Sequence, residues 1–233
     1  MATQVQDLIT MIRDRTDMTN DNFITDQALV TYINASAGEL DDLLVQTYDD
    51  YKLSSTILSI TSNNYCPLPA DFYKPRGVEV FCNSPQPYSV RPFNFQERNR
   101  YANSPFVGAL GPYNIRYRVQ DGYFFIEPIT SAIGVYTFWY TPAFASLTSA
   151  SQYLPSYMDI QSWCEYITVD CCIKVKMKLE LDFVSFESLK EPLRQRILIM
   201  NKGRSAAEGK TVSAIRGEFD ELYGFTFGQN GNY

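Results

Sequence analysis

The strongest periodic pattern in the chain lies between Met158 and Met200. Its first part carries two rows of apolar residues at steps of three and four, namely Ile160, Trp163, Cys164, Ile167 and Cys171, and Tyr166, Val169, Ile173 and Met177. Two apolar rows predict a helix that is buried on several sides. After Leu181 the pattern restarts with Leu189, Leu193 and Ile197, with Lys190, Arg194 and Arg196 on the faces between. This second part predicts a half-exposed helix.

Residues 173–181 are also compatible with a strand, because apolar and charged residues alternate there with the period of a half-buried strand. We favour a helix, since the apolar run begins well before the alternation and no Gly, Pro or Asn separates the two parts. Leu, Met, Lys and Glu, which fill the segment, are also good helix formers.

Two further amphipathic helices are predicted near the N-terminus. Val5, Leu8, Ile9 and Ile12 share one face of the first, which ends in residues 13–16, where its arginines suit a helix C-terminus. Thr25, followed by Asp26, has the character of an N-cap with an acidic first turn. The second helix then runs from this cap to about Tyr48.

The middle of the chain has a different texture, because nine of the twelve prolines fall between Pro67 and Pro128 and exclude long helices. Four segments are expected to be strands: Gly77–Cys82, Ile115–Val119, Tyr123–Glu127 and Ile133–Tyr140. Asp121-Gly122 between two apolar runs is a strong hairpin signal. A small antiparallel sandwich or barrel is therefore predicted, with a short surface helix over residues 94–102.

These elements predict an α+β fold. Residues 1–52 and 153–202 are expected to form one helical bundle, and residues 53–152 an inserted antiparallel β sandwich or barrel. The remaining residues, 203–233, hold half of the glycines, and their aromatic residues are irregularly spaced. We therefore expect an extended C-terminal arm that docks on a partner.

Composition excludes several function classes. The chain has no histidine, which removes the usual base of Ser and Cys hydrolases and the usual zinc ligand. A net charge of −6 argues against a broad basic surface for nucleic acid. The five cysteines (Cys66, Cys82, Cys164, Cys171 and Cys172) are expected to be reduced, and neither a signal peptide nor a membrane-spanning segment is expected.

No cofactor is expected, because the sequence lacks the glycine-rich motifs that hold nucleotides. Carboxylate pairs at Asp41-Asp42 and Asp49-Asp50, and Glu127, are candidates for acid–base chemistry, but solvated helix faces and a strand end explain them better. The cluster Arg91, Glu97, Arg98 and Arg100 has two open interpretations, an exposed ion-paired helix or a polar contact between subunits.

In the order and spacing of several short segments, the chain resembles the head-to-tail adaptor (connector) proteins of tailed bacteriophages. The segments that carry this resemblance are Phe23–Asp26 through Tyr32–Asn34, Leu68–Lys74 with Arg76–Val78, Pro92–Phe93 through Glu97–Tyr101, and Glu165–Ile167 leading to Leu193 and Arg196–Ile197. They extend over most of the chain to about residue 200, and no single one is diagnostic.

The resemblance implies a non-enzymatic ring, usually of twelve copies, that joins the portal to the tail in the neck of the virion after assembly in the host cytoplasm. Expected partners are further copies of the chain, the portal protein, a downstream tail or nozzle protein, and double-stranded DNA that passes through the lumen without specific binding. No metal, cofactor or membrane is implied.

Two sets of contact residues follow as expectations. The arm is expected to dock on the portal through Arg204, Lys210, Arg216, Phe219, Tyr223, Phe225 and Phe227. Subunits are expected to meet through Arg91, Glu97, Arg98 and Arg100. Two alternatives stay open, a carboxylate-dependent peptidoglycan hydrolase of the tail and another tail ring component such as a tail-tube terminator.

Overall fold

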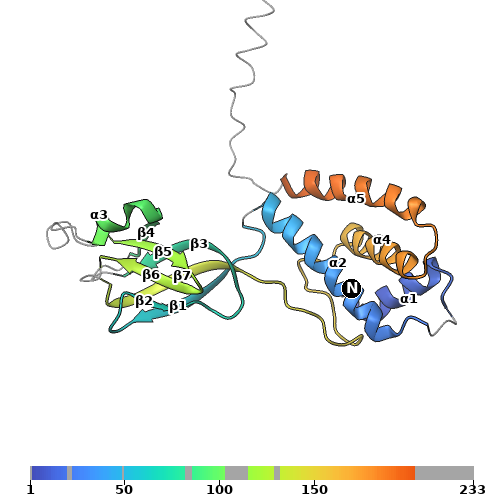
Figure 1. Cartoon of the computed structure of the whole chain (residues 1–233), viewed down its shortest axis with the longest axis horizontal. Helices are drawn as coiled ribbons and strands as arrows, with labels where there is room; N and C mark the ends of the chain where they lie inside the picture. Colours follow the sequence, from blue (N-terminus) through green and yellow to red (C-terminus); the bar gives the residue numbers. More distant parts are fainter. Residues whose placement is uncertain are drawn as a thin grey trace, which may run out of the picture.

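The structure is a computed structural model that describes residues 2–19, 23–48, 50–81, 86–102, 115–128 and 132–202. Within these residues the fold is mixed α+β, with five α-helices and a nearly closed, barrel-like sheet of seven strands. Figure 1 shows two lobes along the longest axis. We call α1, α2, α4 and α5 the helical body, and β1 to β7 with the short helices η1 and α3 the β module.

The helical body begins with the two helices that the sequence predicts. Helix α1 spans Val5–Arg15, and α2 spans Asp26–Thr47 with its C-cap at Tyr48. The N-cap of α2 is Thr25, whose hydroxyl oxygen accepts a hydrogen bond from the backbone N–H of Ala28 at 3.3 Å. The predicted cap and the predicted end of this helix are therefore confirmed.

The C-terminal half of the helical body consists of α4 (Gln161–Lys178) and α5 (Val184–Lys202). Helix α4 is continuous through residues 173–178, so the helical interpretation of the alternating segment is confirmed as far as Lys178. It is buried on several sides, as its two apolar rows predict, whereas α5 buries only Ile197 and Asn201.

One hydrophobic core serves all four helices of the body. Its buried members include Leu8 of α1, Ile33 of α2, Trp163 of α4 and Ile197 of α5. The segment between the β module and α4 also contributes, since Leu147 and other apolar residues of that segment are buried in the same cluster. Packing of an amphipathic face against a shared core accounts for most helix stability in proteins.

The β module contains more strands than the four that the sequence predicts. The strands are β1 (Ser54–Ile60), β2 (Tyr65–Pro67), β3 (Phe72–Val80), β4 (Tyr88–Pro92), β5 (Arg116–Gln120), β6 (Tyr123–Glu127) and β7 (Gly134–Pro142). They are arranged in the order β1-β7-β3-β4-β5-β6-β2, and β1 touches β2, which nearly closes the sheet into a barrel.

The expected barrel is thus present, with one correction to its predicted antiparallel character. Strands β4 and β5 are parallel neighbours, whereas every other pair of neighbours is antiparallel. A parallel pair needs a long connection, and the chain provides one between Pro92 and Arg116.

Strand β3 begins earlier than predicted, at Phe72, although Pro75 lies within it. The register between β3 and β7 shifts on both sides of Pro75, between Phe72 and Lys74 and between Pro75 and Gly77. Such irregularities place a proline, which has no N–H to donate, where the ladder is already interrupted.

The predicted hairpin is confirmed at Asp121-Gly122, which connects β5 and β6. Both residues have positive φ, 52° and 79°, as the tight turn between twisted strands requires. The strands enclose a second core built around Phe124, Ile126 and Phe138, each fully buried. Most of the aromatic residues in these strands therefore serve packing.

The predicted surface helix at residues 94–102 is also present, as a 3₁₀ turn η1 (Phe95–Glu97) followed by α3 (Arg98–Ala102). Within the described ranges no helix combines the length and the apolar content that crossing a bilayer would take. Residues 203–233, and with them the whole predicted arm, lie outside the described residues.

Candidate protein interface

The four residues of the expected subunit contact belong to β4, to α3 and to the 3₁₀ turn between them, and Figure 1 shows β4 and α3 at one end of the β module. Arg91 is in β4, Glu97 ends η1, and Arg98 and Arg100 belong to α3. Glu97 also has a local role, because its carboxylate accepts the backbone N–H of Asn94 at 3.2 Å and closes a capping box. The three arginines of the set are exposed to solvent.

Aromatic rings lie against two of these arginines, Arg98 and Arg100. The guanidinium of Arg98 lies 4.0 Å from the ring centroid of Phe95, and that of Arg118, from β5, lies 4.5 Å from the same ring. The guanidinium of Arg100 lies 5.9 Å from the ring centroid of Tyr101. A guanidinium stacked on a ring keeps its N–H edge available for a carboxylate or phosphate.

Two arginines of this surface, Arg116 and Arg118, are not in the predicted set. They are two residues apart in β5, so both point away from the barrel interior, into which the buried Tyr117 projects. The parallel pairing of β4 with β5 places Arg91 beside Arg116. The alternation Arg-Tyr-Arg-Val in the sequence is the signal that could have identified them.

A shallow groove of about 450 Å³ lies between η1 and β5. Its lining is mostly apolar, and its members are Pro75, Pro92, Phe93, Asn94, Phe95, Tyr117, Arg118 and Val119. Half of the surface of Phe95 is exposed, although Arg98 and Arg118 both stack on its ring. We call the groove, with Arg91, Arg98 and Arg100 beside it, the arginine–aromatic surface.

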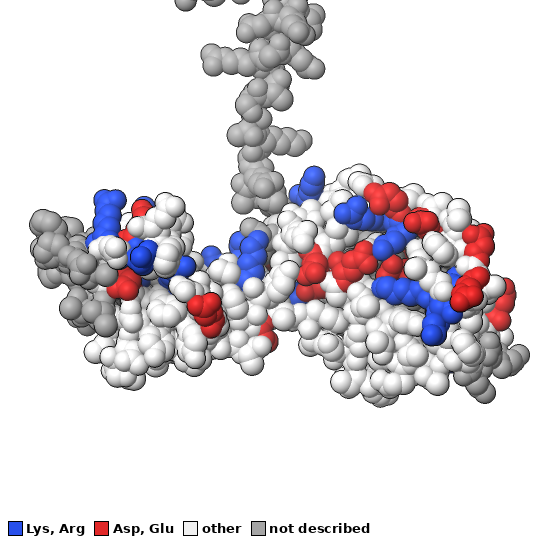
Figure 2. All heavy atoms as spheres, viewed as in Figure 1, with Lys and Arg blue, Asp and Glu red and all other residues white. Residues whose placement is uncertain are grey.

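Four arginines of this surface are not neutralised within the part of the chain that the structure describes. There, Arg91, Arg98, Arg100 and Arg118 form no ion pair with a carboxylate. Figure 2 shows Lys and Arg gathered on the upper side of the β lobe. An acidic protein that keeps such a group of unpaired arginines presents a ready contact for an anionic partner.

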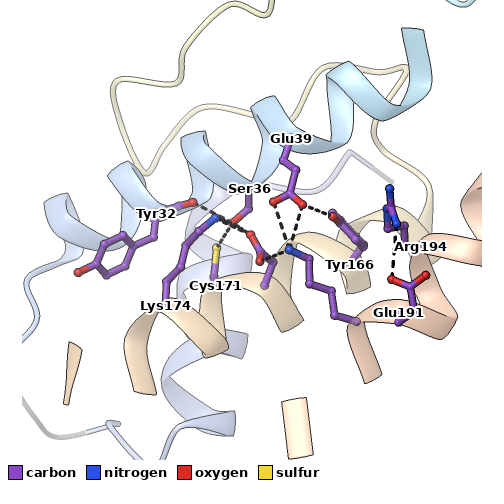
Figure 3. Close-up of polar contacts among 10 residues, drawn as sticks. Tyr32, Ser36, Glu39, Tyr166, Cys171, Lys174, Glu191 and Arg194 are labelled. Carbon is purple, nitrogen blue, oxygen red and sulfur yellow. Dashed lines mark hydrogen bonds and ion pairs between the residues drawn. The ribbon is translucent and has the colours of Figure 1, made fainter. Parts of the chain in front are cut away.

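The helical body has a different polar feature, a buried network between α2, α4 and α5 (Figure 3). Asp170 of α4 is its centre and is almost fully buried. Its carboxylate accepts a hydrogen bond from the hydroxyl of Ser36 at 2.6 Å and forms ion pairs with Lys174 and, at 2.8 Å, with Lys190. Lys190 of α5 also pairs with Glu39 of α2 at 3.0 Å.

These contacts determine the ionisation of the network. Burial opposes the charge of Asp170, but the hydrogen bonds from Lys174, Lys190 and Ser36 outweigh it, so the pKa of Asp170 lies below its usual value. Burial likewise opposes the charge of Lys190, and its bonds to Asp170 and Glu39 raise its pKa above the usual value. Both groups are charged at neutral pH, and Lys190 thereby fastens the exposed helix α5 to α2 and α4.

The thiols show no sign of reactivity. Cys66, Cys164, Cys171 and Cys172 are buried and free, in agreement with the predicted reduced state, while Cys82 lies outside the described residues. Burial raises the pKa of Cys171 to about 12. A thiol that stays protonated at neutral pH is a poor nucleophile.

The candidate carboxylates of an acid–base site are engaged in other contacts. Asp41 is buried and paired with Lys52 at 2.6 Å, and Asp42 accepts the hydroxyl of Tyr73 at 2.8 Å. Asp50 is paired with Arg76, and Glu127 accepts an amide hydrogen bond from Asn64 at 3.0 Å. Asp49 lies outside the described residues. Across the described residues, no group of acidic, Cys or His side chains is arranged to hold a metal ion.

The expected portal-docking residues are all in the part of the chain that the structure does not describe. They are Arg204, Lys210, Arg216, Phe219, Tyr223, Phe225 and Phe227.

Comparison with protein families gives a match over most of the chain. The family model described as SU10 adaptor protein matches residues 3–170, which is well over half of the chain. The chain therefore belongs to the SU10 adaptor protein family, which indicates a structural, non-enzymatic phage protein and agrees with the resemblance found in the sequence. No curated protein matches the sequence.

Proposed function

We propose that this adaptor-family protein forms a ring between the portal and the tail, in the neck of the virion, and that double-stranded DNA passes through the ring. The observation that carries the proposal is the family match over residues 3–170. In this role the chain is a virion component that is assembled in the host cytoplasm. Twelve copies are proposed, on the resemblance to connector proteins.

The organisation of the chain supports a ring. We propose that residues 1–52 and 153–202 act as one helical bundle, that residues 53–152 form the β module, and that residues 203–233 are an arm. A ring closes when each copy offers two unlike faces that contact neighbouring copies head to tail. The acidic helical body and the arginine–aromatic surface are unlike in this sense. Arg91, Glu97, Arg98 and Arg100 are proposed as part of the contact between subunits.

The arm is proposed to dock on the portal, and loops of the β module to meet the downstream tail or nozzle protein. Aromatic residues on a chain segment can bury much surface on a preformed partner, and the arginines and lysine of the arm add charge contacts. The net charge of −6 supports passage of DNA without specific binding, because an acidic wall repels the phosphates.

The first test is to mix the full-length protein with portal protein and to examine the product by mass measurement and negative-stain imaging. A ring of twelve copies bound to the portal is expected. Binding to tail-tube protein with no binding to portal would instead identify the chain as a terminator of the tail tube. Two mixtures, one with portal protein and one with tail-tube protein, therefore distinguish the two results.

The second test removes the arm. Deleting the residues after Gly203 is expected to abolish attachment to the portal and to leave the helical and strand content of the remaining chain unchanged by circular dichroism. The matched variant replaces Phe219, Tyr223, Phe225 and Phe227 with Ser in the full-length chain. Attachment at wild-type affinity in both variants would remove the arm from the proposal.

A further inference from the structure

The turn between α4 and α5 carries acidic and apolar residues that are both exposed. Glu180 and Asp182 are exposed carboxylates. Met177, Leu181 and Val184 alternate with them and keep 57%, 49% and 63% of their surface accessible to solvent. We call residues 177–184, which also include the exposed Lys178, the acidic turn. Apolar side chains exposed beside charges at one place are typical of a contact surface.

Two acidic residues at this end of the helical body occupy positions that do not favour them. Asp17 follows α1 with a φ of 60°, and Glu180 follows α4 with a φ of 56°. Glycine, asparagine and, less often, aspartate adopt this left-handed conformation after a helix, so the conformation is unusual for Glu180 but not for Asp17. A negative charge at a helix C-terminus is also disfavoured by the helix dipole. Local stability therefore does not explain why carboxylates are placed here.

The two positions belong to one surface. The ammonium group of Lys176, near the end of α4, donates to the backbone carbonyl oxygen of Thr16, directly before Asp17, at 3.3 Å. The ends of α1 and α4 thus lie side by side, and Asp17 extends the acidic turn.

The acidic turn and the arginine–aromatic surface lie at opposite ends of the molecule. In Figure 1, whose horizontal direction is the longest axis, α3 lies at the left end and the connection from α4 to α5 at the right end. Figure 2 shows Asp and Glu along the right edge, with Lys and Arg on the left lobe. One copy cannot bring the two surfaces together, but two neighbouring copies can.

We propose that the acidic turn of one copy binds the arginine–aromatic surface of the next, so that Glu180 and Asp17 approach Arg98 and Arg118 while Leu181 or Met177 enters the groove. The proposal rests on the proposed ring and deepens it by naming the two complementary faces. Guanidinium groups stacked on rings are well placed for bidentate pairing with carboxylates. Because the two faces differ, the contact is heterologous and can close a ring.

The composition of the groove favours a protein partner over nucleic acid. Its lining includes Pro92, Phe93 and Val119, and the phosphate groups that duplex DNA presents on its outside have no apolar surface to bury against them. The acidic turn offers carboxylates and apolar side chains together, which match both parts of the surface. The contact is therefore expected to weaken with salt but not to vanish, since its apolar part is not screened.

Charge reversal tests the contact in the full-length chain. Arg98→Glu/Arg118→Glu reverses the groove, and Asp17→Lys/Glu180→Lys reverses the turn. Each double variant is expected to weaken self-association at least about 100-fold, because like charges then face each other. A chain that carries all four changes restores opposite charges and is expected to associate again. An equimolar mixture of the two double variants is also expected to associate, with alternating copies.

The matched control is Arg194→Glu/Arg196→Glu on α5, two exposed arginines outside both surfaces. This control changes the net charge by the same amount as Arg98→Glu/Arg118→Glu does. It is expected to associate as the wild type does. Sedimentation velocity over a range of concentrations gives the mass of each species, and thermal unfolding of each variant shows whether it is folded. Recovery in the four-change chain separates a lost contact from a damaged fold.

Three results have distinct meanings. A wild-type protein that stays monomeric at its highest soluble concentration would overturn the contact, and so would association that both reversed variants retain. Neither result touches the proposed role if the protein still binds portal. Conversely, failure to bind portal, together with salt-sensitive association that the four-change chain restores, would leave the contact standing and remove the proposed role.

Discussion

The helical body and the β module keep their charged groups in opposite places. In the helical body, Asp170 and Asp41 are buried and ion-paired, and they contact distant parts of the chain through Lys190 and the hydroxyl of Tyr157, respectively. Among the residues that the structure describes in the β module, no charged side chain is fully buried, and the core is aromatic and aliphatic. Its arginines lie on the outside. The body uses buried charge to fix its own arrangement, whereas the module keeps its charged side chains at its surface.

The sequence composition of the two regions shows the same division. Residues 1–52 and 153–202 together contain ten basic and seventeen acidic side chains, whereas residues 53–152 contain seven basic and five acidic ones. A net charge of −6 for the whole chain conceals this difference. The total charge describes the average surface of the protein. The charge of each region has to be examined to identify an interface.

The largest expected effect tests whether the two cores are independent. Phe138→Ala removes a fully buried ring from the β module and is expected to destabilise it by about 3–5 kcal/mol. Trp139 lies in β7 and Trp163 in α4, so the two tryptophans of the chain report one region each. With Trp163 or Trp139 replaced by Phe, urea unfolding followed by fluorescence measures each region separately.

In the Phe138→Ala variant, the midpoint reported by Trp139 is expected to fall while that reported by Trp163 changes little. Leu40→Ala in α2 is the matched change in the other core and is expected to give the opposite pattern. Equal shifts at both tryptophans would show that the two regions unfold as one unit.

The sequence predicts the helical body well because its helices bury continuous apolar rows that have no rival period apart from residues 173–181. The β module was harder to predict. Strand β1 is rich in serine, and β3 and β4 contain Pro75 and Pro92, which mask the alternation typical of a strand. The parallel pairing of β4 with β5 depends on contacts between residues far apart, for which one sequence gives no signal.

The same limit applies to the polar sites. Lys190 was assigned to a solvent-exposed helix face, which is the usual place for a lysine, but its two partners come from other helices. Arg98 was found because it lies in a short charged segment. Arg118 was missed because its ring partner, Phe95, lies more than twenty residues away in the chain.

The next largest effect concerns the buried network. Asp170→Ala leaves Lys174 and Lys190 facing each other without their shared carboxylate, and we expect a loss of about 3 kcal/mol. Chemical denaturation followed at Trp163 measures it. Asp42→Ala, an exposed carboxylate of the same region, is the control and is expected to cost less than about 1 kcal/mol. Equal losses in the two variants would contradict a structural role for the network.

The stability of the helical body should depend more on pH than that of the β module, because only the helical body holds buried charged groups among the described residues. The pKa of Asp170 is lowered on folding, so its contribution is complete above its ordinary value near 4 and is lost as the pH falls through its folded value. The pKa of Lys190 is raised, so its contribution is complete below its ordinary value of 10.5 and is lost as the pH rises further. The unfolding midpoint reported by Trp163 is therefore expected to decrease at pH values below and above this range.

The midpoint reported by Trp139 is expected to change less with pH, because the core of the β module holds no buried carboxylate or ammonium group among the described residues. In the Asp170→Asn variant, the acid-sensitive part of the Trp163 midpoint should disappear. An unchanged acid dependence in that variant would assign the effect to another carboxylate.

The smallest effect has opposite signs in the two regions. Gly38 lies inside α2 with ordinary helical φ and open space around its Cα, so Gly38→Ala is expected to stabilise the helical body by about 0.5–1 kcal/mol. Gly122 also has open space, but its φ of +79° belongs to the hairpin turn, so Gly122→Ala is expected to destabilise the β module by about 1 kcal/mol. A Cβ added at either glycine meets no other atom within 4 Å, so the opposite signs of the two stability changes come from backbone conformation. Thermal unfolding of the single-tryptophan proteins measures both, and shifts of the same sign would mean that the turn at Gly122 does not have the left-handed conformation described above.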